Sequence, residues 1–150
     1  MEIKRYTAAR IDDVVEFERA IRREEDFWGW DIDEAYGKAV KESFDDPKFA
    51  NAVSLLAYEG GRVVGRIDAA LICSRFDGRV QAYLDWICVV KSSRHRGTAQ
   101  ALLRALRSLL REEYGVTTLI ALMARNDEAQ RFYRSIERAA IHDEAIWIEC

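Results

Sequence analysis

The stretch "YLDWICVVKSSRHRGTAQALLRAL", from Tyr83 to Leu106, joins the three local patterns that decide the fold. As far as Val90 it is apolar almost throughout, which is typical of a strand that is covered on both faces. A short turn rich in lysine, arginine and histidine follows and ends at Gly97. From Gln100 onward, leucines recur at helical spacing and arginines form another face. The stretch therefore predicts a strand, a cationic turn and an amphipathic helix.

The cationic turn has the chemistry of an anion-binding site. The first N–H groups of the helix lack partners within the helix, and its dipole places partial positive charge there. Gly97 and Ala99 have little or no side chain, so a ligand can approach the backbone, and Arg94 and Arg96 add full charges. This combination suits a phosphate or diphosphate, although a solvated loop with arginines facing water gives the same pattern. With one glycine and no GxxxxGK[ST], the turn is neither a P-loop nor a dinucleotide fingerprint.

Outward from this stretch, the patterns predict the order β-α-α-β-β-β-α-β-α-β-β in a single domain over residues 1–150. A Gly60-Gly61 turn and an Asp77-Gly78 turn join the middle strands as hairpins. The strand-helix-strand passage after residue 80 predicts one right-handed parallel crossover in a mixed, mostly antiparallel α+β sheet. The expected strands are 2–6, 51–58, 63–73, 80–90, 116–124, 139–142 and 145–149. The first expected helix begins near 12, with Asp12 or Asp13 as its N-cap. Further helices are expected over about 33–44 and 100–113, and from Asn126 or Asp127, one of which is the cap, to about 137.

Composition limits the classes of function. A net charge of −3 argues against nucleic-acid and membrane-surface binding, which usually need a basic excess. The apolar runs are too short to span a bilayer and the N-terminus has no signal-peptide core, so we expect a cytoplasmic protein. Three cysteines, Cys73, Cys88 and Cys150, without a CxxC spacing, and only two histidines favour neither a disulfide nor a metal site.

The same stretch resembles the acetyl-CoA-binding segment of the GCN5-related N-acetyltransferases, the GNAT superfamily. The family's loop has the form [Q/R]xxGx[G/A], and Arg94, Gly97 and Ala99 fill its three defining positions. Ile87 and Val89 fill the apolar positions of the preceding strand.

A second family segment has Asn opening a helix, Ala three residues later, and Phe-Tyr at positions six and seven. Asn126, Ala129, Phe132 and Tyr133 match all four positions, in the family's order and at about its usual distance. The resemblance covers Tyr83 to about Ile136. It departs from the family after Tyr133, because "RSIERAA" has Glu137 and Arg138 where a glycine and an aromatic residue are usual. The far wall of the acceptor site is therefore expected to differ.

The resemblance implies the acyl-CoA N-acyltransferase fold, with helices on both faces of the sheet and a splayed parallel strand pair at its centre. Coenzyme A would lie in that gap, between strands 80–90 and 116–124. The backbone of Ile87, Cys88 and Val89 would pair with the pantetheine arm. Asn126 would contact the pantetheine or order the site; otherwise it is a plain N-cap. The diphosphate would be held by Arg94, His95, Arg96, Gly97, Thr98 and Ala99.

Transfer to an alkylamine, with a pKa near ~10.4, needs a base that removes a proton. Asp85 is the one ionisable residue of its apolar strand, and the family often has an acid there; a salt bridge, an edge carboxylate or a water acting as base are the alternatives. Tyr133 occupies the position of the family's general acid, and its alternative is a core aromatic beside Phe132. The Val89 N–H would be an oxyanion donor.

The acceptor would lie against the segment "EEDFWGWDIDE", where Trp28 and Trp30 flank a glycine among acids. These tryptophans, with Asp68, would bind a cationic or aromatic amine, unless they serve core packing. The sequence thus predicts an N-acetyltransferase that moves an acetyl group from acetyl-CoA directly to a primary amine in a ternary complex. The acceptor is a small molecule or a protein amino group. The alternatives are a non-catalytic acyl-CoA-binding module and, disfavoured by charge, a nucleic-acid-binding domain. Homodimers are common in the family.

Overall fold

The computed structural model of the protein describes residues 1–25, 29–142 and 145–149. Its contacts divide the chain into two compact units, Met1–Ile120 and Ala121–Cys150, and each is described by itself. Among the described residues, the first unit carries four strands, most of a fifth and three α-helices. The second carries one helix, α4 (Asp127–Arg134), and the segment that follows it.

A five-stranded sheet is built in the order β1-β2-β3-β4-β5. The first four strands pair antiparallel, and β5, which follows a helical crossover, forms a parallel pair with β4. The predicted α+β class with a mixed, mostly antiparallel sheet is therefore confirmed. The strands are β1 (Glu2–Arg5), β2 (Ala52–Glu59), β3 (Arg62–Cys73), β4 (Val80–Val89) and β5 (Leu119–Ala121).

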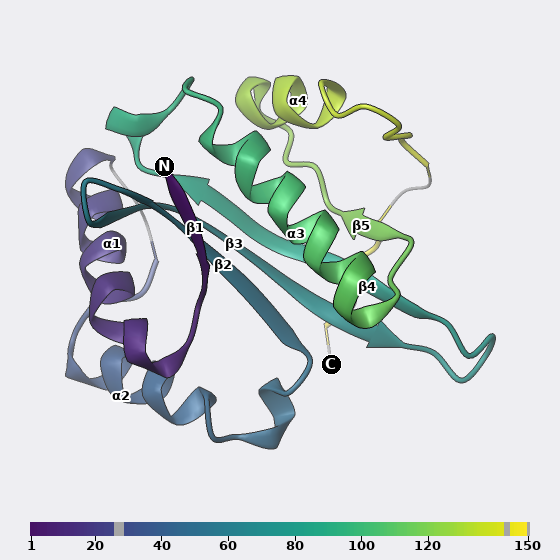
Figure 1. Ribbon diagram of the computed structural model, residues 1–150, viewed down its shortest axis with the longest axis horizontal. Helices are drawn as coiled ribbons and strands as arrows, with labels where there is room; N and C mark the ends of the chain where they lie inside the picture. Colours follow the sequence, from purple (N-terminus) through teal and green to yellow (C-terminus); the bar gives the residue numbers. More distant parts are fainter. Residues whose placement is uncertain (26–28, 143–144, 150) are drawn as a thin grey trace. The chain divides into compact units, whose positions relative to one another are not determined.

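Helices cover both faces of the sheet (Figure 1). Helix α1 (Ile11–Glu24), with α2 (Glu34–Ser43) beside it, lies on one face, where its Glu18 reaches Arg66 of β3. Helix α3 (Thr98–Tyr114) lies on the other, because its Leu102 packs against the neighbouring Gly65. Adjacent residues of a strand point to opposite faces, so these two contacts place α1 and α3 on opposite sides.

Core side chains lie on both faces of the sheet. Leu56 lies opposite Arg66 and is buried on the α1 face with Phe17. The leucine face of α3 is buried, as its spacing predicts, and Leu102 and Leu106 are fully enclosed, as is Ile67, which points to the same face of β3 as Gly65. Gly65 permits this close packing, since a Cβ there would come within 3.1 Å of side-chain carbons of α3. The start of α3 is thereby pressed against β3, which positions the turn that precedes it.

The turn between β2 and β3 forms as the sequence predicts. The β2–β3 hairpin closes at the Glu59–Arg62 pair, and Gly60 and Gly61 take φ angles of 55° and 78°. Such left-handed pairs match the twist of the flanking strands.

The expected ends of several elements are wrong. Helix α1 begins one residue before Asp12, its N-cap is Arg10, and no side chain caps it. Asp12 and Asp13 lie instead in the first turn, where the helix dipole stabilises negative charge. The strand expected over 116–124 is reduced to the three residues of β5.

The second unit departs most from expectation. Its described residues contain no strand at 139–142 or 145–149, where two closing strands were predicted. Arg138, which stands where the family has an aromatic residue, adopts a φ of 62°, a conformation that costs a non-glycine residue about 1 kcal/mol. Apolar side chains beyond it, Ile146 and Trp147 among them, are 81% and 78% exposed.

Candidate active site

A β-bulge places Asp85 at the middle of β4. In the pairing of β3 with β4, Asp68 lies opposite Trp86 and Ala69 lies opposite Leu84, so Asp85 is an extra residue without a counterpart. Bulges interrupt the ladder and redirect a side chain, and they are frequent beside active sites. Asp85 is exposed, although it stands within an apolar strand. The base predicted from the sequence is therefore presented to solvent.

The register beyond the bulge determines which backbone groups of β4 face outward from β3. Val89 lies opposite Gly65, and the N–H of Val90 donates to the carbonyl of Val64 over 2.9 Å. In an antiparallel pair, this pattern turns the N–H and C=O of Val89, and of Ile87 two residues earlier, away from β3. It turns those of Cys88 toward β3. Of the three predicted pantetheine contacts, only Ile87 and Val89 present their backbone to the outer edge.

The start of β5 occupies the first part of that outer edge. The N–H of Ala82 donates to the carbonyl of Thr118 over 3.1 Å, directly before β5. From these positions, β4 continues for seven residues to Val89, while β5 continues for only three to Ala121. The outward groups of Ile87 and Val89 thus lie farther along β4 than β5 extends.

The turn after β4 has the geometry of an anion cradle. A single 3₁₀ turn, η3 (Lys91–Ser93), leads to His95 at φ 60° and Gly97 at φ 83°. Gly97 is the N-cap of α3, and no side chain caps that helix end. A Cβ at Gly97 would meet no atom within 4 Å, so the backbone angle calls for glycine while the space above it is open. His95 and Arg96 are exposed beside this open helix end, and the residues fit an anionic group.

Arg94 plays a different part from the one predicted for its charge. Its Nε–H donates to the carbonyl of Val89 over 3.0 Å, and its guanidinium forms an ion pair with Glu25. The side chain is only 21% exposed. Arg94 is therefore fastened to β4 and to the end of α1, a contact between distant residues for which the sequence carries no local signal.

Cys88 lies close to this arginine, on the α1 face. Burial raises the pKa of its thiol to about 11, against the opposing effect of the Arg94 charge. At neutral pH the side chain is a protonated, largely unreactive thiol.

A buried polar cluster, formed by Glu18, Ser54, Arg66 and Asp68, lies on the α1 face of the sheet. Asp68 accepts hydrogen bonds from Ser54 Oγ at 2.6 Å and from Arg66 at 2.9 Å. Arg66 also pairs with Glu18, at 3.4 Å. Burial alone would lower the pKa of Arg66, but the charge and hydrogen bond of Asp68, together with the charges of Tyr6 and Glu18, outweigh it, and the net shift is upward. Asp68, predicted at the acceptor site, is thus held within this cluster.

Aromatic side chains lie beside the cluster. Trp30 is 57% exposed, and its ring stacks on Tyr36 with centroids 6.4 Å apart. The Arg22 guanidinium lies 5.6 Å from the Trp30 ring, an arrangement that stabilises a cation over a π face. Burial raises the pKa of Tyr36. Trp28, the other predicted acceptor residue, lies outside the described residues.

The second unit holds the other family segment. Asn126 is the N-cap of α4, and its Oδ1 accepts the N–H of Ala129 at 2.8 Å. Tyr133 is half-buried on the same helix, with its ring edge-to-face against Phe132 at 5.1 Å. Of the two caps that the sequence offers, Asn126 and Asp127, the structure has Asn126, and the predicted helix ends at Arg134 instead of near residue 137.

The described ranges contain no helix long and apolar enough to cross a membrane. Within the same ranges, no group of three or more His, Cys, Asp or Glu side chains is arranged to hold a metal ion.

Comparison with known proteins identifies the family. The sequence matches the acetyltransferase (GNAT) family over residues 12–136, whereas no curated protein sequence matches it significantly. Among solved structures, a ribosomal-protein-alanine N-acetyltransferase from Brucella melitensis biovar Abortus 2308 is 17% identical, with a TM-score of 0.75 over 99% of this chain and 100% of that one. The aminoglycoside 6'-N-acetyltransferase of Acinetobacter haemolyticus is also 17% identical, with a TM-score of 0.74 over 100% and 98%.

A third structure is an aminoglycoside N-acetyltransferase in complex with CoA, 18% identical, with a TM-score of 0.68 over 99% of both chains. At these identities the structures show the fold, and the family match extends over most of the sequence. The chain belongs to the acetyltransferase (GNAT) family.

Proposed function

We propose that the chain, as a single domain over residues 1–150, transfers the acetyl group of acetyl-CoA directly to a primary amine within a ternary complex. One observation carries this proposal: the outward backbone groups of Ile87 and Val89 lead straight into an open, uncapped helix start at Gly97. A solved relative of the same fold is in complex with CoA, which supports the choice of co-substrate.

In this proposal, the cofactor site is a strand edge followed by an amide cradle. The N–H and C=O groups of Ile87 pair with the pantetheine arm as a neighbouring strand would, while the Val89 N–H is left for the acetyl oxygen and the Val89 carbonyl accepts from Arg94. The amides of residues 95–99 and the positive end of the α3 dipole hold the diphosphate, and Arg96 adds charge. Acetyl-CoA supplies the activated acetyl thioester.

The proposed chemistry assigns two proton transfers to two side chains. Asp85, exposed at the bulge, removes a proton from the acceptor ammonium, whose lone pair then attacks the acetyl carbon. Tyr133 donates its phenolic proton to the departing sulfur as the carbon–sulfur bond breaks. The N–H of Val89, turned away from β3, serves as oxyanion donor. Asn126 orders the helix that carries Tyr133.

The acceptor in this proposal binds on the α1 face, against the exposed ring of Trp30 and near Asp68, with Trp28 as a further contact. A flat aromatic surface beside carboxylates favours an amine, either small or at a protein terminus or lysine.

The test is release of free CoA from acetyl-CoA with a panel of amines, together with CoA binding by calorimetry. Tyr133→Phe should lower kcat by about 100-fold or more while CoA affinity is kept, because only the acid is removed. Gly97→Glu should abolish CoA binding by steric block and like-charge repulsion. Unchanged CoA affinity in Gly97→Glu would reject the site.

A non-catalytic acyl-CoA-binding module is the second candidate. The replacement of the usual glycine-aromatic pair by Glu137 and Arg138, with Arg138 in a left-handed conformation, favours it. In that case the protein would bind CoA with the same dependence on Gly97 but release none with any amine.

A further inference from the structure

The end of α1 is hydrogen-bonded to the turn that precedes α3. Glu24, the last residue of α1, accepts two hydrogen bonds from Ser92: its Oε2 from the backbone N–H and its Oε1 from the hydroxyl, each at 2.8 Å. These bonds, first that of the backbone and then that of the side chain, lower the pKa of Glu24. Its carboxylate is therefore charged at neutral pH and acts as a cap for η3, which has no side-chain cap at Val90.

The next residue makes a second attachment. Glu25 pairs with the guanidinium of Arg94, whose Nε–H donates to the carbonyl of Val89. Arg94 thus bridges the end of α1 and the outer edge of β4. We name the Glu24–Ser92 and Glu25–Arg94 contacts together the α1 latch.

The segment that follows the latch, residues 95–97, contains two left-handed backbone conformations that neighbouring contacts must hold in place. His95 is a non-glycine residue at φ 60°, which costs about 1–2 kcal/mol, and Gly97 is also left-handed. Such conformations persist only where surrounding contacts impose them. The latch holds residues 92 and 94, immediately before this strained segment, and α3 holds it from the other side.

The charges of Glu24 and Glu25 also act directly on a bound anion. Two carboxylates near an anion site repel a diphosphate, but the charge of Glu25 is paired with Arg94, and water and salt screen the exposed charge of Glu24. We propose that Glu24 and Glu25 are positioning residues, which hold the amides of residues 95–99 in the conformation that binds the diphosphate. This inference rests on the proposed function, since the ligand is CoA.

Calorimetric titration with CoA tests the latch directly. Glu24→Gln, Glu25→Gln and the uncharged change Ser92→Ala should each weaken CoA binding by about fivefold, the usual effect of a lost hydrogen bond or ion pair. The matched control is Glu16→Gln, whose exposed ion pair with Arg23 lies on the same helix, and it should leave affinity within about twofold.

A double variant separates positioning from simple electrostatics. If Glu24 acts through Ser92, then Glu24→Gln combined with Ser92→Ala should weaken binding little more than either change alone. In each latch variant, the KM for acetyl-CoA should rise while kcat stays nearly unchanged. The melting temperature of each variant, measured without CoA, should match that of Glu16→Gln.

Each outcome decides between the two proposals. Unchanged or tighter CoA binding in all latch variants, or full additivity in the double variant, overturns the latch while the proposed function stands. Failure of the unmodified protein to bind CoA overturns the proposed function and the latch with it.

Discussion

The buried polar cluster and the α1 latch use the same chemistry at opposite degrees of burial. In the cluster, Glu18 pairs with Arg66, and Ser54 donates to Asp68. In the latch, Glu25 pairs with Arg94, and Ser92 donates to Glu24. The Glu18 side chain is 3% exposed, whereas that of Glu25 is 32% exposed. Breaking a buried pair leaves a charge without compensation, but water replaces a partly exposed one at little cost. We therefore expect the cluster to determine stability and the latch to determine only the shape of the cofactor turn.

The largest effect should follow loss of the arginine in the cluster. Arg66→Ala would leave Asp68 without its partner and remove one from Glu18, so the free energy of unfolding should fall by about 3–5 kcal/mol. Urea denaturation measures it. Arg23→Ala, at an exposed pair with Glu16, is the control and should cost less than about 1 kcal/mol. Equal losses in the two variants would show that burial of the cluster adds nothing to its contribution to stability.

A smaller loss is expected in the strained turn beside the latch. Gly97→Ala meets no steric obstacle, but its φ of 83° should cost about 1–2 kcal/mol of stability. Gly37→Ala is the matched control, because this glycine lies within α2 with open space around it and alanine should stabilise that helix by about 0.5–1 kcal/mol. Thermal unfolding of both variants gives the comparison. A neutral Gly97→Ala would mean that the turn is unstrained.

The change with pH in the contribution of Glu24 to the free energy of unfolding should be smaller still. The pKa of Glu24 is lower in the folded protein than its ordinary value, so its contribution to stability is present above that ordinary value and is lost as pH falls through the lower one. Since Glu24 is largely exposed, we expect well under 1 kcal/mol. Subtracting the unfolding free energy of Glu24→Gln from that of the unmodified protein, between pH 7 and pH 3, isolates the effect. A difference that grows toward acid would contradict the assignment.

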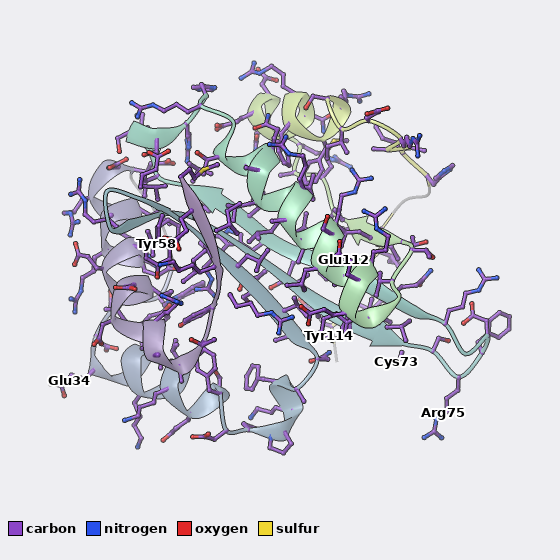
Figure 2. The ribbon with its side chains drawn as sticks, viewed as in Figure 1. Glu34, Tyr58, Cys73, Arg75, Glu112 and Tyr114 are labelled. Carbon is purple, nitrogen blue, oxygen red and sulfur yellow. The ribbon has the colours of Figure 1, made fainter. Side chains whose placement is uncertain are left out.

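The thiol of Cys88 responds to charges of both the buried polar cluster and the α1 latch. Burial first, and then the charges of Glu25 and Glu18, raise the pKa of its thiol to about 11, and Arg94 opposes them. Iodoacetamide at pH 8 should therefore label it more slowly than Cys73, the exposed residue labelled near the end of β3 in Figure 2. Glu25→Gln removes one of those charges and should speed labelling of Cys88 about twofold. Peptide mapping with Cys73 as the internal reference measures it, and slower labelling would contradict the geometry.

Local patterns in the sequence predicted the fold class and the helices α3 and α4 well. The leucine spacing of α3 and the cap at Asn126 each depend on residues within one or two turns of each other. The cofactor role of the turn at Gly97 stays a prediction. The Asp85 bulge and the Glu24–Ser92 contact depend on pairing between distant segments, which periodicity does not encode.

The closing strands were mispredicted for a related reason. The run from Ala145 to Glu149 has strand-like alternation, but a strand also needs a partner, and the described residues there are in none.

The bulge at Asp85 has a consequence for changes of chain length. Because Asp85 is the extra residue, losing that single codon would leave Leu84 opposite Ala69 and Trp86 opposite Asp68 in an uninterrupted ladder. The alternation from Trp86 to Val89 would be kept, and the same backbone groups would face outward. A one-residue deletion there should therefore be tolerated by the sheet, and it should remove only the side chain that the bulge redirects.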